Sequence, residues 1–327
     1  CIRDSWSRQA LMGAAIVVVL GLPHLIWQIA GGWPTLEFIR NAHEHKNVAM
    51  PPGVFWSEQL LMAHPAFAPF WLIGVFGLLL APRLRPWRPL GVAFVVVGIW
   101  LTVQHAKPYY LVAAYPMVMA AGAVLVMHWL ARWRRLARAM TVALPSVVVL
   151  LGLLVAPLAI PLLSPVNYVA YEQTLGLRPR NAENSPMGDL PQHFADRFGW
   201  RERAISVGEV HASLPAADRD HCLIVTGNYG ECGAINYWAP KLDLDLPTAV
   251  SGHNSCHTWW PERDDWRVVL VVGGSRERAE RSFGSVELGA VSEHSLAVPY
   301  EQSLPVWICR EPLRSWAELW AEARFAI

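Results

Sequence analysis

Five long apolar runs occupy the first half of the sequence. They lie at about 10–30, 58–80, 88–104, 109–130 and 141–164. A helix needs roughly 20 apolar residues to cross about 30 Å of hydrocarbon. The third run is the shortest, but its core, PLGVAFVVVGIWLTV, carries no charge. One such run could be a buried helix of a soluble protein, whereas five within 164 residues predict a polytopic α-helical membrane domain.

The composition agrees with this prediction and divides the chain in two. Hydrophobic residues make up 54% of the chain and charged residues 16%, which is too apolar for an average soluble protein. Residues 1–164 hold 12 Lys and Arg against 4 Asp and Glu, and residues 165–327 hold 15 against 22. We therefore expect a basic transmembrane domain over 1–164 and an acidic globular domain over 165–327. No basic patch with interleaved aromatic residues indicates a nucleic-acid partner.

Two short basic loops predict how the spans are oriented. APRLRPWRPL joins the second and third runs, ARWRRLARAM joins the fourth and fifth, and together they hold seven of the twelve basic residues of 1–164. Short loops rich in Lys and Arg usually stay in the cytoplasm. We therefore expect the loop around 31–57, the segment QHAKP and everything after about 165 to lie on the outer face.

The first outer loop, GGWPTLEFIRNAHEHKNVAMPPG, predicts an amphipathic helix over 33–46. Its polar residues recur at steps of three and four, namely Glu37, Arg40, Asn41 and Glu44. With Trp33 as an interfacial aromatic residue, such a helix would lie on the outer membrane surface. It could be an inert surface element. Alternatively it is a platform over a lipid-facing cavity, on which Glu37, Arg40 and Asn41 help to position a substrate head group.

A cluster of polar and aromatic residues stands where the fourth run begins, in QHAKPYYLVAAYP. Lys107 could meet a phosphate, while Tyr109 and Tyr110 supply hydroxyl donors and His105 a ring nitrogen. The plainer interpretation is an aromatic belt with a lysine that reaches to the membrane surface. The residues alone leave both interpretations open.

Strands and helices are predicted to alternate after the last span, which favours a small extracytoplasmic α/β domain. We expect strands at CLIVTGNYG, TAV, WRVVLVVGG and LPVWICREP. Helices are expected at FADRFGWRERAISVGEVHASL, ECGAINYWAPKL and SRERAERSF, and again after the last strand. VVGGSRERAE lacks the glycine patterns of nucleotide loops and predicts a turn and helix cap.

Candidate binding residues follow the first two of these strands. Asn228, Tyr229 and Glu231 come after the first strand, and His253 and Asn254 after the second. Open α/β sheets bind ligands at such strand ends, so these residues could form an acceptor or glycan surface. The neighbouring Trp259 and Trp260 could stack on a sugar or pack in the core.

The thiols and imidazoles of this domain could in principle form a metal site or disulfides. His253, Cys256 and His257 match no standard zinc spacing, so we predict no metal site. Four cysteines of the domain, Cys222, Cys232, Cys256 and Cys309, suggest one or two disulfides in an extracytoplasmic domain, or else buried free thiols.

Several motifs together resemble a known family. GGWPTLEFIRN, AKPYYLVAAYP, TGNYGECGAINYW and VSGHNSCHTWWP are similar to segments of bacterial dolichyl-phosphate-mannose–protein mannosyltransferase-like proteins. These are membrane glycosyltransferases of the GT-C type, related to aminoarabinose transferases, and the resemblance covers essentially the whole chain. It implies an enzyme of the bacterial inner membrane with a periplasmic C-terminal domain. Such an enzyme transfers a sugar from a polyprenyl-phosphate donor to a lipid, glycan or protein acceptor.

The resemblance also implies roles for residues. In such enzymes an acidic residue of the first outer loop acts as base or organises a metal, but the acids of 1–164 form no Asp-Glu motif; they are Asp4, Glu37, Glu44 and Glu58. The chain begins with Cys1 and no signal peptide. We therefore expect the catalytic base upstream, in a longer protein, with no cofactor in this chain and a divalent metal as an option in the full-length enzyme. Lys107, with His105, Tyr109 and Tyr110, would bind the donor phosphate.

A different class of function also fits the apolar runs. The chain could be a non-catalytic membrane scaffold, or a transporter, that carries an outer α/β domain. None of the five runs has a Lys, Arg, Asp or Glu near its centre. Ion-coupled transport usually requires such a residue, so its absence counts against a transporter.

Overall fold

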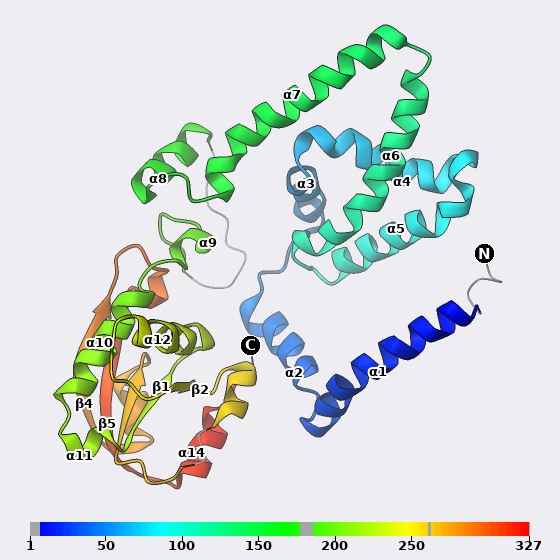
Figure 1. Ribbon diagram of the computed structural model, residues 1–327. Helices are drawn as coiled ribbons and strands as arrows, with labels where there is room; N and C mark the ends of the chain where they lie inside the picture. Colours follow the sequence, from blue (N-terminus) through cyan, green and yellow to red (C-terminus); the bar gives the residue numbers. More distant parts are fainter. Residues whose placement is uncertain (1–6, 177–185, 261–262, 327) are drawn as a thin grey trace. The chain divides into compact units, whose positions relative to one another are not determined.

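The chain folds into two compact units, which are described separately. The structure, a computed structural model, describes residues 7–176, 186–260 and 263–326, and it is mostly helical with one β-sheet (Figure 1). One unit is Val48–Ala182, and the other combines Cys1–Asn47 with Glu183–Ile327. The sequence predicted a boundary at residue 164, where the last span ends. Packing instead groups the first helices with the α/β part.

The unit Val48–Ala182 consists of helices only. They are α3 Pro52–Met62, η3 Pro65–Phe67, α4 Ala68–Leu80, η4 Pro82–Trp87, α5 Arg88–Val103, η5 Pro108–Ala114, α6 Tyr115–Leu130, α7 Arg134–Ala159 and α8 Pro165–Thr174. Its core is formed by aromatic and aliphatic side chains from α3 to α6, with Phe55, Phe94 and Leu111 almost fully buried.

The other unit begins with three helical segments and continues as an α/β domain. The first three are α1 Arg8–Ala30, α2 Pro34–Asn41 and the π-helix η2 Ala42–Lys46. The helices of the α/β domain are α9 Gln192–Ala195, α10 Trp200–Ser213, α11 Ala216–Arg219, α12 Tyr229–Lys241, η6 Asn254–Trp259, α13 Arg276–Glu280, η7 Pro299–Glu301 and α14 Trp316–Ala323. Its strands are β1 Cys222–Thr226, β2 Ala249–Ser251, β3 Val268–Val272, β4 Phe283–Glu293 and β5 Ser303–Pro312. The predicted helix at 33–46 thus forms as α2 and η2.

Among the described residues, four helices are long and apolar enough to cross a membrane. They are Leu11–Ala30, Pro82–Val103, Pro108–Leu130 and Arg134–Ala159, and the bent pair Pro52–Met62 and Pro65–Leu80 would make a fifth. Five spans were predicted in these places, and the described residues contain four, or five if the bent pair is one span. The last one is shifted, because its helix already begins in the basic segment at Arg134 and ends at Ala159 rather than at 164.

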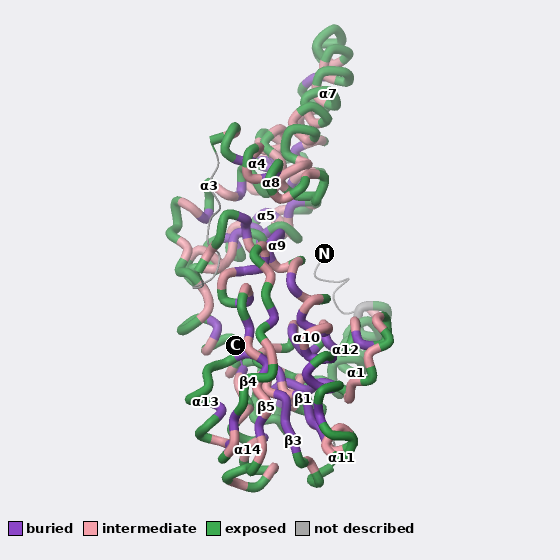
Figure 2. The backbone as a smooth tube through the Cα atoms, turned by 90° about the vertical axis from the view of Figure 1, so that its left-hand side faces the viewer, coloured by how far each residue is buried: buried purple, intermediate pink, exposed green. Residues whose placement is uncertain are grey.

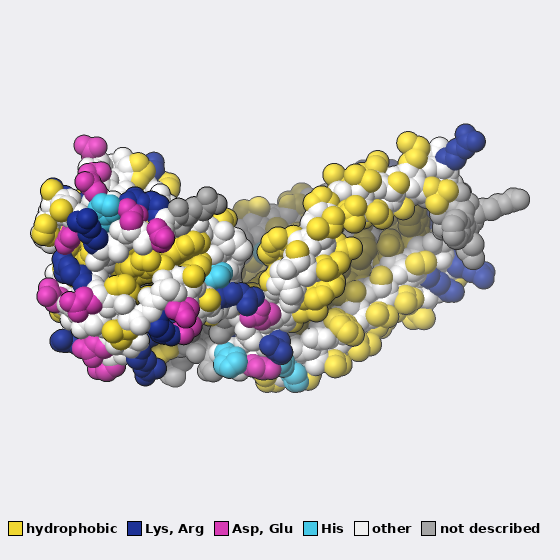
Figure 3. Space-filling view, turned by 90° about the horizontal axis from the view of Figure 1, so that it is seen from below, with side chains coloured by type: hydrophobic (Ala, Val, Ile, Leu, Met, Phe, Trp, Pro, Cys, Tyr) yellow, Lys and Arg dark blue, Asp and Glu magenta, His cyan; other side chains and the backbone are white. Residues whose placement is uncertain are grey.

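Apolar side chains on these helices face outward. No residue of α7 is buried, and the helix is drawn as exposed along most of its length in Figure 2. Leu20 and Val17 of α1 are 74% and 70% exposed. Figure 3 shows hydrophobic side chains covering the apolar helices, whereas charged side chains gather over the α/β part. An apolar surface of this extent suits hydrocarbon rather than water, which supports a membrane protein.

The predicted span 58–80 is not one continuous helix but part of a bent pair of helices. α3 ends at Met62, and the chain bends by 95° before the segment Pro65–Leu80. Proline pushes the preceding residue out of the helical region, and the ψ of His64 is accordingly 123°. The φ of His64 is positive, at 63°, which adds to the break. Since α4 alone has 13 residues, it is about 20 Å long and too short to cross a bilayer. The segment is therefore a broken or re-entrant span.

Helices α4 and α6 cross at two glycines. A Cβ atom added to Gly74 would lie 1.7 Å from the carbonyl oxygen of Val118, and one added to Gly122 would lie 1.9 Å from that of Phe70. No side chain fits at either place without separating the helices. Small residues at such crossings let the two backbones approach closely.

The five strands form one mixed sheet in the order β2-β1-β3-β5-β4. β1 pairs in parallel with β2 and β3, whereas β5 is antiparallel to both β3 and β4. Four of the strands were predicted. β4 was missed, because glycines, serines and glutamates interrupt its apolar residues, so neither a continuous apolar run nor a regular alternation marks it. Its pairing with β5 shifts register between Leu288 and Ala290, as in a β-bulge.

Helices cover the two faces of the sheet unequally. Alternate strand residues point to opposite faces. Ile224 and Leu270 lie in the core beneath α10 and α12, and Val269 lies in the core beneath α14. On the first face two helices of 14 and 13 residues are packed. On the second face α13 has only five residues and α14 only eight.

The four cysteines of the α/β domain are free thiols. The expectation of disulfides was therefore wrong, and the alternative of free thiols holds. Cys222 lies in the core on the α10 and α12 side of the sheet, whereas Cys309 lies in the core on the opposite side. The sheet itself separates these two sulfur atoms. Burial raises the pKa of both thiols to about 12 and that of Cys232 to about 11.

Replacing Gly74 by Ala should destabilise the helical unit Val48–Ala182, because the new methyl group collides with the backbone of α6. The matched control is Gly152→Ala in α7, where an added Cβ meets nothing within 4 Å. That control should be neutral or stabilising by up to ~1 kcal/mol, since alanine favours helix. Thermal unfolding of the purified protein in detergent measures both variants. Equal midpoints for the two would contradict the close crossing.

The cysteines should differ in their reaction with iodoacetamide. The thiolate is the reactive form, and Cys256 is only half-buried, so it should be alkylated first in the folded protein. Cys222, Cys232 and Cys309 should react only after unfolding. Peptide mapping under non-reducing conditions makes the measurement. A peptide pair joined through any two of these residues would show that the thiols are not free.

Candidate functional site

The predicted phosphate-binding residues lie in one turn of the helical unit, between α5 and η5. Lys107 precedes η5 in extended conformation, and Pro108 occupies the first helical position. His105 adopts a positive φ of 50°. Its Nδ1 lies 3.0 Å from the carbonyl oxygen of Met50, and its own carbonyl oxygen accepts from the Met50 amide at 3.5 Å. The turn is thus fastened to the segment that leads into α3.

A buried glutamine of α3 holds the same turn from the core side. Gln59 is fully buried, and its Nε2 donates to the carbonyl oxygen of Pro108 at 3.0 Å. The hydroxyl of Tyr115 donates to Gln59 Oε1 at 2.6 Å. The ring of Tyr115 in turn packs edge-on against Trp71 and Phe94. This chain of contacts connects the turn rigidly to the aromatic core.

The side chains of the turn differ in what they offer a ligand. Tyr109 and Tyr110 are 50% and 52% exposed, and their rings meet edge to face at 4.8 Å. Lys107 is half-buried. Because a carbonyl oxygen can only accept, the Nδ1 of His105 must carry the proton toward Met50. The neutral ring therefore presents a lone pair at Nε2, and only the protonated ring donates a second hydrogen bond.

Two of the three predicted positioning residues of α2 bind another part of their own unit. Glu37 forms an ion pair of 2.5 Å with Arg324, and the side-chain amide of Asn41 donates to the carbonyl oxygen of Ala326 at 2.8 Å. Arg40, the third, is exposed. Residues 324–326 are thereby attached to α2, a contact that no sequence motif indicated.

The same residues, 324–326, pass beside the end of β2. The Phe325 ring stacks on His253 at 4.5 Å, its amide donates to Gly252 and its carbonyl oxygen accepts from Asn254. Gly252 has no room for a side chain, because an added Cβ would lie 1.8 Å from the carbonyl oxygen of Ala323. This packing holds residues 323–325 against the segment that follows β2.

The candidate acceptor residues meet at this edge. The ring of Tyr229 lies 4.6 Å from that of His253, and the Tyr229 amide donates to His253 Nδ1 at 3.4 Å. His253 is buried, whereas Tyr229 is 50% exposed and Asn254 is half-buried. Asn228 is close by but faces inward. The structure thus brings together the residues that were predicted from two separate motifs.

Asn228 belongs to a buried polar network behind this edge. Its Oδ1 caps α12 by accepting from the Glu231 amide, and its Nδ2 donates to Glu231 Oε1 and to Glu301 Oε1 at 3.0 and 3.1 Å. Glu301 pairs with Arg203 at 3.0 Å, and all three charged residues are at most 5% exposed. The amide of Asn228 is therefore used within the protein and is not available to a glycan.

Sequence reasoning missed Arg203 and Glu301. They lie 98 positions apart, on α10 and η7, and no local pattern connects them. The one available signal was an arginine within an otherwise core-facing stretch of a predicted helix. The guanidinium carbon of Arg203 also lies over the Trp200 ring, 4.9 Å from the ring centroid.

The network changes the acidity of Glu231. Burial raises its pKa from 4.5 to about 7, helped by the nearby charge of Glu301 and opposed by Arg203 and by hydrogen bonds from Gly227 and Asn228. A carboxyl group with this pKa could in principle serve as a base at neutral pH. Glu231 is only 3% exposed, however, and its oxygens already accept from Gly227 and Asn228. It is therefore a structural group.

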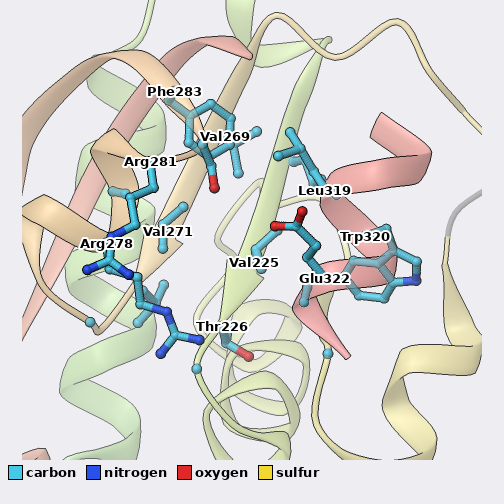
Figure 4. A pocket seen from close by; sticks show the side chains of 18 of the residues that line it. Val225, Thr226, Val269, Val271, Arg278, Arg281, Phe283, Leu319, Trp320 and Glu322 are labelled. Atoms are coloured by element: carbon cyan, nitrogen blue, oxygen red, sulfur yellow. The ribbon is translucent and has the colours of Figure 1, made fainter. Parts of the chain in front are cut away.

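A cavity of about 650 Å³ opens on the face of the sheet opposite α10 and α12. It lies between the strands β1 and β3 and the helices α13 and α14. Figure 4 shows Val225, Val269 and Val271 on the strands, with Arg278 and Arg281 on one side and Leu319, Trp320 and Glu322 on the other. The predicted turn and helix cap at VVGGS forms one wall, where Ser275 Oγ accepts from the Arg278 amide.

Within the described residues no group of three or more His, Cys, Asp or Glu is arranged to hold a metal ion. His257 instead stacks on Trp320 and Cys256 is a free thiol. Of the two candidate stacking residues, Trp260 packs on Trp320 in the core, whereas Trp259 is 69% exposed.

Comparison of the chain with protein-family models, with curated proteins and with solved structures finds no match. The family resemblance is therefore carried by its motifs alone, and the activity that it implies is a proposal.

Replacing Glu231 by Gln should flatten the pH dependence of stability. The raised pKa means that the folded state keeps its proton between about pH 4.5 and 7, whereas the unfolded state releases it. The contribution of Glu231 to the free energy of unfolding is therefore complete below about pH 4.5 and is lost as the pH rises to about 7. The total loss is roughly 3 kcal/mol. Thermal unfolding across this range measures the effect, and Glu209→Gln, at an exposed position of α10, is the control. Equal slopes for the two variants would contradict the assignment.

Proposed function

We propose that this chain forms the membrane and outer-domain portion of a glycosyltransferase that uses a polyprenyl-phosphate sugar. The observation that carries the proposal is the fastened turn at 104–110. It presents a lysine and two exposed tyrosines at the end of a long apolar helix, where a lipid phosphate would lie. Rigid support from Gln59 suits a group that must be positioned before reaction.

The chemistry requires three contributions. A carboxylate activates the acceptor hydroxyl, the acceptor oxygen attacks the anomeric carbon, and the bond from that carbon to the lipid phosphate breaks. In our proposal the ammonium of Lys107 stabilises the negative charge on the leaving phosphate, and the hydroxyls of Tyr109 and Tyr110 donate to its oxygens. We assign this base to no residue of the chain. His105 contributes a hydrogen bond only when it is protonated.

The orientation and the acceptor complete the proposal. The basic loops would lie in the cytoplasm of a bacterium, and the turn and the α/β domain at the periplasmic face of the inner membrane. Tyr229 and Asn254, with Trp259 exposed nearby, would contact the acceptor, which is a lipid, a glycan or a protein. Because Glu37 and Asn41 bind residues 324–326, α2 would act on the acceptor through that contact, with Arg40 as the exposed charge.

A non-catalytic scaffold is the competing proposal from a different class of function. A scaffold would also need the apolar helices. It would explain the lysine of the fastened turn only as a membrane anchor. The two candidates differ in whether polyprenyl phosphate is released from a donor, so one assay separates them.

Replacing Lys107 by Ala in the full-length protein should lower donor turnover by roughly 10²-fold, because a stabilising charge at the leaving group is lost. The measurement is the release of polyprenyl phosphate from polyprenyl-phosphate hexoses and pentoses in reconstituted vesicles. Lys107→Arg should retain part of the activity. The control Arg132→Ala removes an exposed charge from the basic segment between α6 and α7 and should turn over donor like the unmodified protein.

Two outcomes would overturn the proposal. Unchanged turnover in Lys107→Ala would leave this lysine as a membrane anchor. If the unmodified full-length protein releases no polyprenyl phosphate from any of these donors, the non-catalytic scaffold becomes the better interpretation.

A further inference from the structure

The cavity on the α13 and α14 side of the sheet has an apolar floor that lacks a covering helix. Val271 lies on β3, the central strand of the sheet, yet it is only half-buried, as is Val225 on the adjacent β1. On the opposite face of the same strands Ile224 and Leu270 are completely buried. Central strand residues normally pack under a helix. Here the volume above them is open, about 650 Å³, and within the ~300–1,000 Å³ that small-molecule sites occupy.

The cavity also lies where α/β sheets bind ligands. The order β2-β1-β3 reverses the direction of connection at β1, and such switch points form crevices at the carboxyl ends of the strands. Glycines follow the three parallel strands at this edge and line the cavity: Gly227, Gly252, Gly273 and Gly274. Gly273 and Gly274 have φ values of 82° and 72°, which other residues rarely adopt.

The charges around the cavity are unbalanced. Arg314 pairs with Glu322, and both line the cavity, so these two charges compensate one another. Arg278 and Arg281 also line it and are exposed, and among the described residues neither forms an ion pair. Figure 4 shows the two arginines together on one side of the apolar floor. The net excess is positive, which favours an anionic group at this rim.

The walls favour an aliphatic group over a nucleotide base. A base would need a free aromatic face to stack on. Five aromatic residues line the cavity, and each already contacts another ring: Trp320 lies 4.9 Å from His257 and 4.5 Å from Trp260, Phe283 lies 6.3 Å from Trp316, and Phe325 stacks on His253 at 4.5 Å. The open floor consists instead of valine side chains, with Leu319 opposite. Branched aliphatic side chains bury a hydrocarbon chain well but give a planar ring no specific partner.

We propose that this cavity binds a single-chain anionic amphiphile, with its hydrocarbon chain on Val225 and Val271 and its acidic head group on Arg278 and Arg281. The site belongs to the α/β domain alone, so it does not depend on the glycosyltransferase proposal. A phosphate and a carboxylate head group share the chemistry that these arginines recognise.

Photolabelling tests the proposal on the full chain reconstituted in zwitterionic lipid. The probe is dodecyl phosphate with a diazirine in its chain, and labelled peptides are identified by mass spectrometry. Labelling is expected on peptides that contain the cavity residues of β1, β3 and α14. Excess dodecyl phosphate should compete, whereas dodecanol and inorganic phosphate each lack one half of the recognised structure and should not. Dodecanoate as a further competitor tells a carboxylate head group from a phosphate.

Three variants connect the label to the site. Arg278→Glu with Arg281→Glu should lower labelling by at least about tenfold, because attraction becomes repulsion. Arg276→Glu is the matched control, since Arg276 lies on the same short helix, pairs with Glu280 and does not line the cavity; its labelling should match the unmodified protein. Val271→Trp should abolish labelling by filling the cavity. The arginine variants change only exposed side chains, so they keep the test valid if the tryptophan variant does not fold.

Other results would overturn the proposal. Labelling confined to the apolar helices would mean that the probe only partitions into the bilayer. Equal labelling in the arginine double variant and the Arg276→Glu control would exclude an anionic head group at this rim, and full competition by dodecanol would do the same.

Discussion

The buried ion pair between Arg203 and Glu301 is the interaction on which the rest of the α/β domain depends. It joins α10 to the turn before β5, and through Asn228 it reaches the first turn of α12. Two charges removed from water are tolerated only when each has close partners. Removing either partner would leave the other charge buried and uncompensated, which typically costs ~3–5 kcal/mol. The polar edge at Tyr229 and His253 is built on this support.

The two environments of the chain impose opposite requirements on its side chains. In the α/β domain apolar residues are buried on the two faces of the sheet, as water requires. On the apolar helices large hydrophobic residues point outward, and contacts between helices use small residues such as Gly74 and Gly122. Without water to drive association, close backbone packing is what remains to hold such helices together.

The sequence predicted the elements of the fold better than their interruptions or contacts. Long apolar runs and continuous strands such as β1 and β3 are visible because each is a local pattern. β4 was missed because glycine, serine and glutamate interrupt its apolar residues, and the break at His64 was missed because apolar residues continue on both sides of it. The candidate residues at 104–110 and at the strand ends could be named from motifs. Their supports could not be, since Gln59 is 49 positions from Pro108 and Arg203 is 98 positions from Glu301.

The contact between Glu37 and Arg324 has a consequence for the order of assembly. These residues are 287 positions apart, so a ribosome makes α2 long before its partner, and the whole helical unit Val48–Ala182 is synthesised in between. Closing so long a loop costs conformational entropy, but this cost grows only slowly with loop length. The delay between the synthesis of Glu37 and that of Arg324 is set by the rate of translation. During that time α2 lacks its partner, and the lipid interface that its amphipathic sequence suits would offer it another surface.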